Sequence, residues 1–358
     1  MTDMVSPRPQ PRVLRADSAP HTYSLHGHAI RITVGSEFLI EALNHLLGDF
    51  TVPSLPAGIP AVEGMIRLYD AGEVVRRLPA SAARVSPPGE PTEVYQQDEL
   101  YWLIDDRWGL CEINLLRGQW RTWVLPQPAV EPQRCLELAV LWPLAQLLRG
   151  KGLALVPAAS CARDGWGVLL IGQGSIEPEL CAMIRAGYRV VGQRWTALRE
   201  DATSAGGRVS MLRVPGMVER AAHQPRTRIA SATTNVPTTW VDLTHEFVGA
   251  SSDHAHCDAV LLIDRGRRPV AHLKALPRTN AMIGLRRAWP IMQLHAQRKL
   301  SQLHAHLARD CRCYEARLSR NPQDILRLLD DARYNRVGAI EATVHLKPAA
   351  AAARRVVA

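Results

Sequence analysis

The stretch GVLLIGQGSIEPELCAMIRAGYRVVG, Gly167–Gly192, decides how the second half of this chain is expected to fold. It starts with an apolar run, passes through a turn containing two glycines, and then shows the apolar spacing of a helix. This pattern predicts a buried strand, a tight turn and a helix. The order is that of a phosphate-binding loop, because the free N–H groups at a helix N-terminus attract anions. The stretch therefore raises the question of whether the residues of phosphate chemistry are present.

The residues with which a phosphate-binding loop binds phosphate and magnesium are absent. A working loop reads Gly-x-x-x-x-Gly-Lys-Ser/Thr, where lysine neutralises the phosphates and the hydroxyl holds magnesium. Counted from Gly172, the second glycine, the lysine and the hydroxyl are replaced by Glu177, Pro178 and Glu179. A carboxylate close to a phosphate costs on the order of 4 kcal/mol for a pair of unit charges at ~4 Å and an effective dielectric of ~20. We therefore expect ATP in its usual pose to be disfavoured, and we expect no cofactor.

The same acids suit an ordinary helix start. A helix N-terminus prefers a capping hydroxyl, a proline in the first turn and negative charge. With Ser175 as the cap, Glu177, Pro178 and Glu179 fill the first turn in this way. This interpretation makes the loop a capped turn. The alternative is that the two acids bind a metal or a cationic ligand.

The passage from Gly152 to Glu200 resembles the core of the HPr kinase/phosphorylase-like proteins, whose fold is shared with phosphoenolpyruvate carboxykinase. The segments LALVPAAS, RDGWGVLLIGQGS and LCAMIRAGYRVVGQRWTALRE carry the resemblance, which extends over about Cys135 to Asp331. Pro157 stands where the family has a histidine, and Gln193 and Arg194 stand where it has paired aspartates. The resemblance implies an α/β fold, with a mixed sheet and flanking helices like the HPr kinase C-terminal domain, preceded by a small α+β domain. The remodelled loop positions are Gly172, Gly174, Ser175, Glu177, Pro178, Glu179, Gln193 and Arg194.

Composition, periodicity and the resemblance together predict four parts of the chain. HTYSLHGHAIRITVGS predicts a hairpin around Gly27, EFLIEALNHLLGDF predicts a helix, and three short apolar segments up to Leu125 predict a meander. The parts are a mobile leader at 1–19, an N-terminal α+β domain at 20–130, an HPr kinase-like domain at 135–332, and a C-terminal strand and flexible tail at 333–358.

Within the second domain the local patterns predict further elements. LALVPAAS is expected to be one strand, and YRVVGQRWTALRED a strand pair. The polar residues 221–238 predict a long surface loop. Helices are expected from Met282 to Asp310 with a break at Pro290, and from Pro322 to Ala332.

Composition limits the function classes. The chain has 358 residues, is 47% hydrophobic and has a formal charge of +9, with basic residues dispersed along it, so nucleic acid is a disfavoured partner. No apolar run is long enough to cross a bilayer, and the start has no export signal, so we expect a cytoplasmic protein without a membrane partner. The seven cysteines form no CxxC pair, which predicts reduced thiols rather than a disulfide framework or a zinc ribbon.

Several further residues are candidates for a functional site. The segment SDHAHCD offers His254, His256 and Cys257 as lesser metal candidates, although its spacing fits no standard site and a polar loop end is the simpler interpretation. His304 and His306 are expected at the surface of a helix. Ser160 and Cys161 follow a strand, but no nucleophile motif surrounds them. The tryptophans Trp102, Trp108, Trp120 and Trp123 are taken as a candidate partner interface, the alternative being core packing.

These observations lead to a functional hypothesis. The chain is expected to be a catalytically inactive HPr kinase-like pseudoenzyme that binds a protein or peptide, in a peptide-modifying or biosynthetic complex, with homo-oligomerisation left open. One alternative is an enzyme of non-kinase chemistry that reuses the cleft. The other is a basic nucleic-acid-binding protein.

Overall fold

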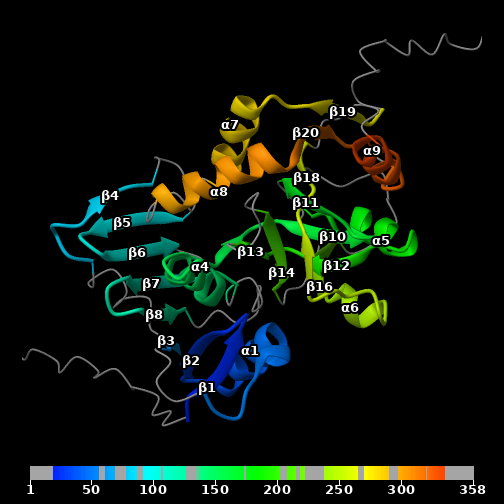
Figure 1. The fold of residues 1–358 in the computed structure, drawn as a ribbon. Helices are drawn as coiled ribbons and strands as arrows, with labels where there is room; N and C mark the ends of the chain where they lie inside the picture. Colours follow the sequence, from blue (N-terminus) through cyan, green and yellow to red (C-terminus); the bar gives the residue numbers. More distant parts are fainter. Residues whose placement is uncertain are drawn as a thin grey trace, which may run out of the picture.

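The computed structural model describes residues 19–55, 61–68, 78–86, 92–105, 108–125, 135, 137–172, 175–201, 208–214, 218–221, 238–264, 270–289, 297–319 and 321–334. Within them the chain folds into β-sheets with helices packed against and between them (Figure 1). This arrangement is the α/β fold that the sequence predicts. The expected leader and tail lie almost wholly outside the described residues.

The first sheet has eight strands in the order β1-β2-β3-β8-β7-β6-β5-β4. β3 pairs parallel with both β2 and β8, and the other neighbours are antiparallel, so the sheet is mixed. The strands are β1 (His21–Leu25), β2 (His28–Val34), β3 (Val62–Leu68), β4 (Ala83–Arg84), β5 (Glu93–Gln97), β6 (Leu100–Asp105), β7 (Gly109–Asn114) and β8 (Gln119–Val124).

Local signals explain the start of this sheet. His26 and Gly27 have φ angles of 51° and 87°, the backbone of a two-residue hairpin turn. Helix α1 (Glu37–Leu47), followed by the 3₁₀ turn η1 (Gly48–Phe50), forms the crossover between the parallel strands β2 and β3. The predicted hairpin, helix and meander of β6, β7 and β8 are confirmed.

The second sheet has six strands in the order β12-β10-β11-β18-β20-β19. Its centre, β11-β18-β20, is parallel, and the outer strands are antiparallel to their neighbours. Helices cover both faces, since α5 and α9 share one apolar cluster with this sheet while α7 and α8 share the other. The strands are β10 (Ala159–Arg163), β11 (Trp166–Gly172), β12 (Arg189–Gly192), β18 (Ala259–Asp264), β19 (His272–Ala275) and β20 (Arg312–Arg317).

A third, antiparallel sheet corrects two expectations. Its order is β17-β14-β13-β9, with β9 (Ala154–Val156), β13 (Thr196–Glu200), β14 (Val209–Arg213) and β17 (His254–His256). LALVPAAS is therefore not one strand, because Pro157 separates β9 in this sheet from β10 in the six-stranded sheet. The segment YRVVGQRWTALRED does form two strands, but they do not pair with each other. β12 joins the six-stranded sheet and β13 the four-stranded one.

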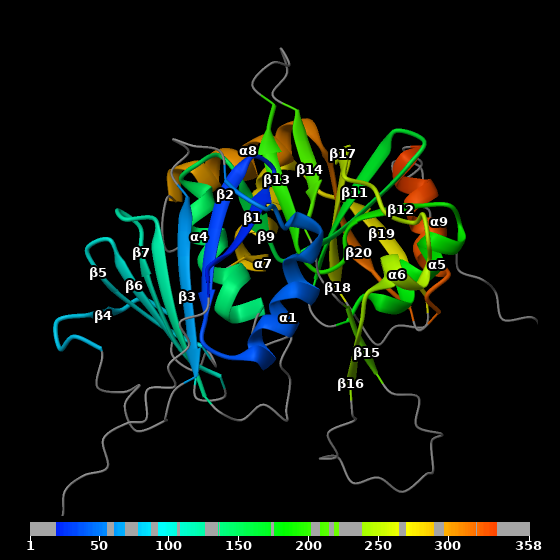
Figure 2. The ribbon, with the colours of Figure 1, turned by 90° about the horizontal axis from the view of Figure 1, so that it is seen from below.

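The helices and a small ribbon complete the fold (Figure 2). The ribbon pairs β15 (Val218–Ala221) with β16 (Thr238–Val241), and the expected loop between them, 222–237, lies outside the described residues. Helix α7 ends at Ala288, just before Pro290, which itself lies outside the described residues, and the predicted last helix is confirmed. The remaining helices are the π-helical turn η3 (Glu137–Leu141), α4 (Trp142–Arg149), α5 (Glu177–Arg185), α6 (Leu243–Glu246), α7 (Arg278–Ala288), α8 (Gln297–Asp310) and α9 (Asp324–Arg333).

One apolar core joins the two halves of the chain. It contains Leu43 of α1 and Trp120 of β8 together with Leu144 of α4, Met211 of β14 and Leu307 of α8. A separate cluster lies between the six-stranded sheet and helices α5 and α9. The expected boundary near residue 130 therefore does not coincide with an end of the main core.

The surface position expected for His304 is wrong. Its side chain is 1% exposed, and its ring lies 5.2 Å from that of Trp289, between centroids. The spacing of apolar residues along α8 does not indicate this burial, because it is α7 that covers the face of α8 carrying His304. His306 is half-buried, and its Nδ1 lies 3.1 Å from a carboxylate oxygen of Glu200.

Candidate functional site

The start of α5 keeps the predicted first-turn acids, but Ser175 does not occupy the predicted N-cap position. Glu177 and Glu179 lie in its first turn with Pro178 between them, as the sequence predicts. The backbone N–H of Glu177 donates to Ser175 Oγ at 3.3 Å, although the residue at the N-cap position itself is Ile176. Glu179 is buried. Gly174 lies outside the described residues.

Gln193 holds a neighbouring helix in place. Its Nε2 donates to Asp242 Oδ1 at 2.6 Å, and its Oε1 accepts from the backbone N–H of Leu243 at 2.8 Å. Asp242 Oδ1 also accepts from the backbone N–H and the hydroxyl of Thr244, so Asp242 caps α6. The side chain at the position of the family's acidic pair is therefore committed to local structure. Arg194, the next residue, is half-buried.

A small polar cavity lies beside this network. Its volume is about 80 Å³, and it lies where α1 and η1 approach the ends of β12 and β14 and the start of α6. Polar side chains dominate its lining and come from both halves of the chain. They are Asn44, His45, Asp49, Gln193, Arg213, Asp242, Thr244 and His245.

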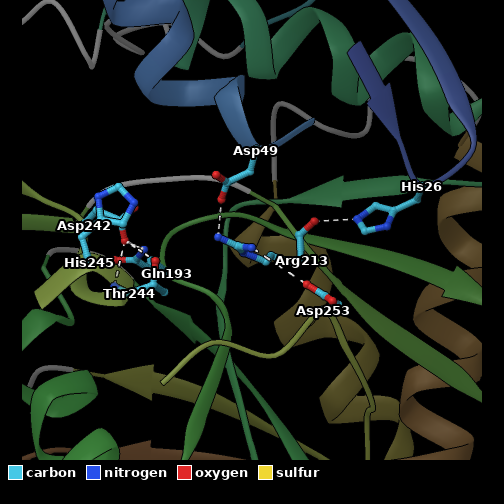
Figure 3. Close-up of polar contacts among 8 residues, drawn as sticks. All are labelled: His26, Asp49, Gln193, Arg213, Asp242, Thr244, His245 and Asp253. Carbon is cyan, nitrogen blue, oxygen red and sulfur yellow. Dashed lines mark hydrogen bonds and ion pairs between the residues drawn. The ribbon is translucent and has the colours of Figure 1, made fainter. Parts of the chain in front are cut away.

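Arg213 connects the two halves at this cavity (Figure 3). Its Nη2 donates to Asp49 Oδ2 at 2.5 Å, and its Nη1 lies 3.9 Å from Asp253 Oδ1. Its carbonyl oxygen accepts from His26 Nε2 at 2.5 Å. Burial lowers the pKa of His26, and the hydrogen bond to the Arg213 carbonyl opposes that effect. Arg213 thus ties η1 and the first hairpin to β14.

A shallow groove continues from the cavity along α1. Its volume is about 420 Å³, and it is lined by Glu37, Ile40, Glu41, Asn44 and His45. Asn44 and His45 line both spaces. The groove and the cavity together form what we term the junction cleft.

Sequence reasoning missed the junction cleft. Asp49, Gln193 and Arg213 come from three distant segments, and no motif relates them. The one local signal is Asp242, whose position two residues before Thr244 is typical of a helix cap. That signal predicts α6 but not what α6 lies against.

The prediction that four tryptophans form a partner interface is wrong. Trp102, Trp108, Trp120 and Trp123 are all buried within the chain. Trp120 belongs to the main core, and Trp102 and Trp123 form a small cluster on the opposite face of the meander. Both faces of β6, β7 and β8 are covered, so these rings are unavailable as surface anchors.

The histidine-rich segment divides between surface and interior. His254 and His256 are exposed and share one face of β17, as alternation along a strand requires, whereas Cys257 is buried. His256 Nδ1 lies 3.7 Å from Asp201 Oδ2. The described residues contain no group of three or more His, Cys, Asp and Glu side chains arranged to hold a metal.

The residues after β9 are structural. Ser160 is fully buried and shares a 2.8 Å hydrogen bond with the hydroxyl of Thr196, which donates to the carbonyl of Ala158. Burial raises the pKa of the Cys161 thiol, which disfavours the nucleophilic thiolate.

The chain is similar to solved structures but not to family models or curated proteins. No protein-family model matches the chain, and no curated protein matches it. Among solved structures, the chain is similar to the Hpr(Ser) kinase/phosphatase from Coxiella burnetii, with 13% identity over 52% of this chain and 93% of that chain, and a TM-score of 0.30. At this identity and TM-score the match assigns no role to any residue. None of the helices in the described ranges has the length and apolar character needed to cross a membrane.

Proposed function

We propose that the chain is a binding subunit built on an HPr kinase-like frame that has lost phosphoryl transfer, and that it binds a protein or peptide partner in a peptide-modifying or biosynthetic complex. The frame is inferred from strand β11, which ends at Gly172, and helix α5, with Gly174 between them in the sequence. The loss is inferred from what the replaced residues do in the fold.

Gln193 is the observation that carries the proposal. At the position of an acidic pair, a side chain that served phosphoryl transfer would face the metal and the nucleophile. Both amide atoms of Gln193 are instead bonded to Asp242 and Leu243. An uncharged side chain held in this way supplies neither a general base nor a metal ligand.

The junction cleft has little enclosed space, since its cavity measures about 80 Å³. The open groove along α1 offers a surface for a polypeptide segment rather than an enclosed site. We place the partner at this groove.

The loss of nucleotide binding is tested by calorimetric titration with magnesium ATP. We expect no saturable binding, because the loop lacks the lysine and the hydroxyl that compensate phosphate charge. A micromolar dissociation constant that disappears in Gly174→Asp would contradict the proposal.

The partner surface is tested by site-specific photo-crosslinking in cells. A photoreactive residue at position 41 or 45, both exposed on α1, is expected to capture a discrete polypeptide partner. The matched control is position 116, where Leu116 is 83% exposed on a turn of the first sheet. Equal capture from all three positions, or products that vanish after nuclease treatment, would overturn the placement and favour nucleic acid in the second case.

A further inference from the structure

Three of the seven cysteines lie together where two parallel strands begin. Cys257 comes just before β18, Cys311 comes just before β20, and Cys313 is the second residue of β20. Val260 lies opposite Cys313 in the register of these strands, so the two preceding cysteines lie at neighbouring strand ends. Each of the three side chains is 7% exposed. The cluster is therefore nearly closed to solvent.

Cys311 is in direct contact with the backbone of Cys257. Cys311 Sγ donates to the carbonyl oxygen of Cys257 at 3.0 Å, and Cys257 Sγ donates to the carbonyl oxygen of Ala259 at 3.6 Å. Cys313 Sγ faces other acceptors, the carbonyl oxygens of Leu307 and Cys311, each at 3.7 Å. The geometry thus selects Cys257 and Cys311 as a pair.

Other pairings and uses fit less well. Cys311 and Cys313 are two residues apart in extended chain, so their Cα atoms are separated by about 6.6 Å, close to the upper limit for a disulfide. Within the described residues, these thiols do not belong to any metal-holding group.

We propose that Cys257 and Cys311 form an oxidative modification site, a thiol pair that hydrogen peroxide converts to a disulfide. In the first step the sulfur of one cysteine of the pair attacks peroxide. The S–O bond forms, the O–O bond breaks, and the thiol proton leaves with the departing hydroxide as water. In the second step the sulfur of the other cysteine attacks this sulfenic acid, and a second water leaves. Two thiols are oxidised, and one peroxide is reduced to two waters.

Tryptic peptide mapping tests this site directly. Trypsin cuts after Arg309, Arg312 and Arg317, so Cys311 and Cys313 are released in different peptides, Asp310–Arg312 and Cys313–Arg317. The folded, full-length protein is treated with a small excess of hydrogen peroxide, its remaining thiols are alkylated, and the digest is analysed by mass spectrometry. We expect a linked species that joins the Cys257 peptide to Asp310–Arg312 and that disappears on treatment with dithiothreitol.

Variants and one further condition decide the outcome. Cys313→Ser is the matched control and should retain the link, whereas Cys257→Ser and Cys311→Ser should abolish it. A dominant link from Cys311 to Cys313, or a Cys257–Cys311 link that forms only in urea-unfolded chain, would overturn the proposal. So would the absence of any link in the wild-type protein, a result that does not depend on the folding of a variant.

Discussion

His304 is a neutral histidine inside the main core. Burial lowers its pKa to about 4, and the positive charges of Arg286 on α7 and Arg149 on α4 act in the same direction. Neither ring nitrogen has a hydrogen-bond partner among the residues that the structure describes. Because the folded pKa lies below the unfolded value of about 6.5, the unfolded chain binds the proton first. The contribution of His304 to stability is therefore complete above about pH 6.5 and is lost as the pH falls toward 4.

This behaviour gives a prediction for pH-dependent stability. Between pH 7.5 and pH 5, His304 alone should lower the free energy of unfolding by about 2 kcal/mol. In His304→Phe this part of the pH dependence should disappear, as measured by urea unfolding at the two pH values. His245→Phe, at an exposed position on α6, is the control. An identical pH dependence in wild type and His304→Phe would show that His304 is not neutralised by the core.

Residue-scale prediction from sequence failed where burial depended on distant segments. The interpretation of Glu177 and Glu179 as first-turn acids succeeded because a helix start is decided within a few residues. His304 and the four tryptophans of the meander failed for the opposite reason. Their exposure depends on which helix or segment covers them, and a single sequence without a known topology does not contain that information.

At the scale of single elements, Gly167 determines how closely strands β11 and β17 of two different sheets approach each other. A Cβ at this position would lie 2.0 Å from the carbonyl oxygen of His256 on β17. Gly167→Ala should therefore lower the free energy of unfolding by about 2–3 kcal/mol, since backbone atoms must move to relieve the overlap. Gly48→Ala is the control, because Gly48 has a helical φ of −54° and open space around it. Urea unfolding of both variants measures the effect, and a neutral Gly167→Ala would contradict the close contact of β11 with β17.

Elements were predictable where one periodic pattern covered them. The hairpin at Gly27, helix α1, β11 and α5 all follow from local spacing and turn residues. The prediction of one strand around Pro157 is wrong. Two short apolar runs lie on either side of the proline, and they form β9 and β10, which belong to different sheets. The helical stretch that begins with η3 is also irregular. Pro143 lacks an N–H at the start of α4, and the preceding turn is π-helical.

At the scale of the whole molecule, the continuous core decides how the chain unfolds. Residues of α1 and β8 belong to the same apolar cluster as residues of α4, β14 and α8. Arg213 adds a polar link from β14 to Asp49 and His26. A ~130-residue N-terminal domain with its own core would be expected to unfold alone. A shared core instead predicts one cooperative transition for both halves.

Hydrogen exchange in urea tests this prediction by following peptides from β2 and from β18 separately. Leu43→Ala removes a fully buried side chain of α1 from the shared core and should cost about 3 kcal/mol. Because both halves unfold in one cooperative unit, the lost free energy of unfolding lowers the unfolding midpoints of the β2 and β18 peptides together. Leu328→Ala is the matched variant in α9, within the separate cluster that also contains Leu261 of β18, and should move both midpoints as well. A midpoint that shifts for β2 while β18 keeps its wild-type value would show that the two halves unfold independently despite their common core.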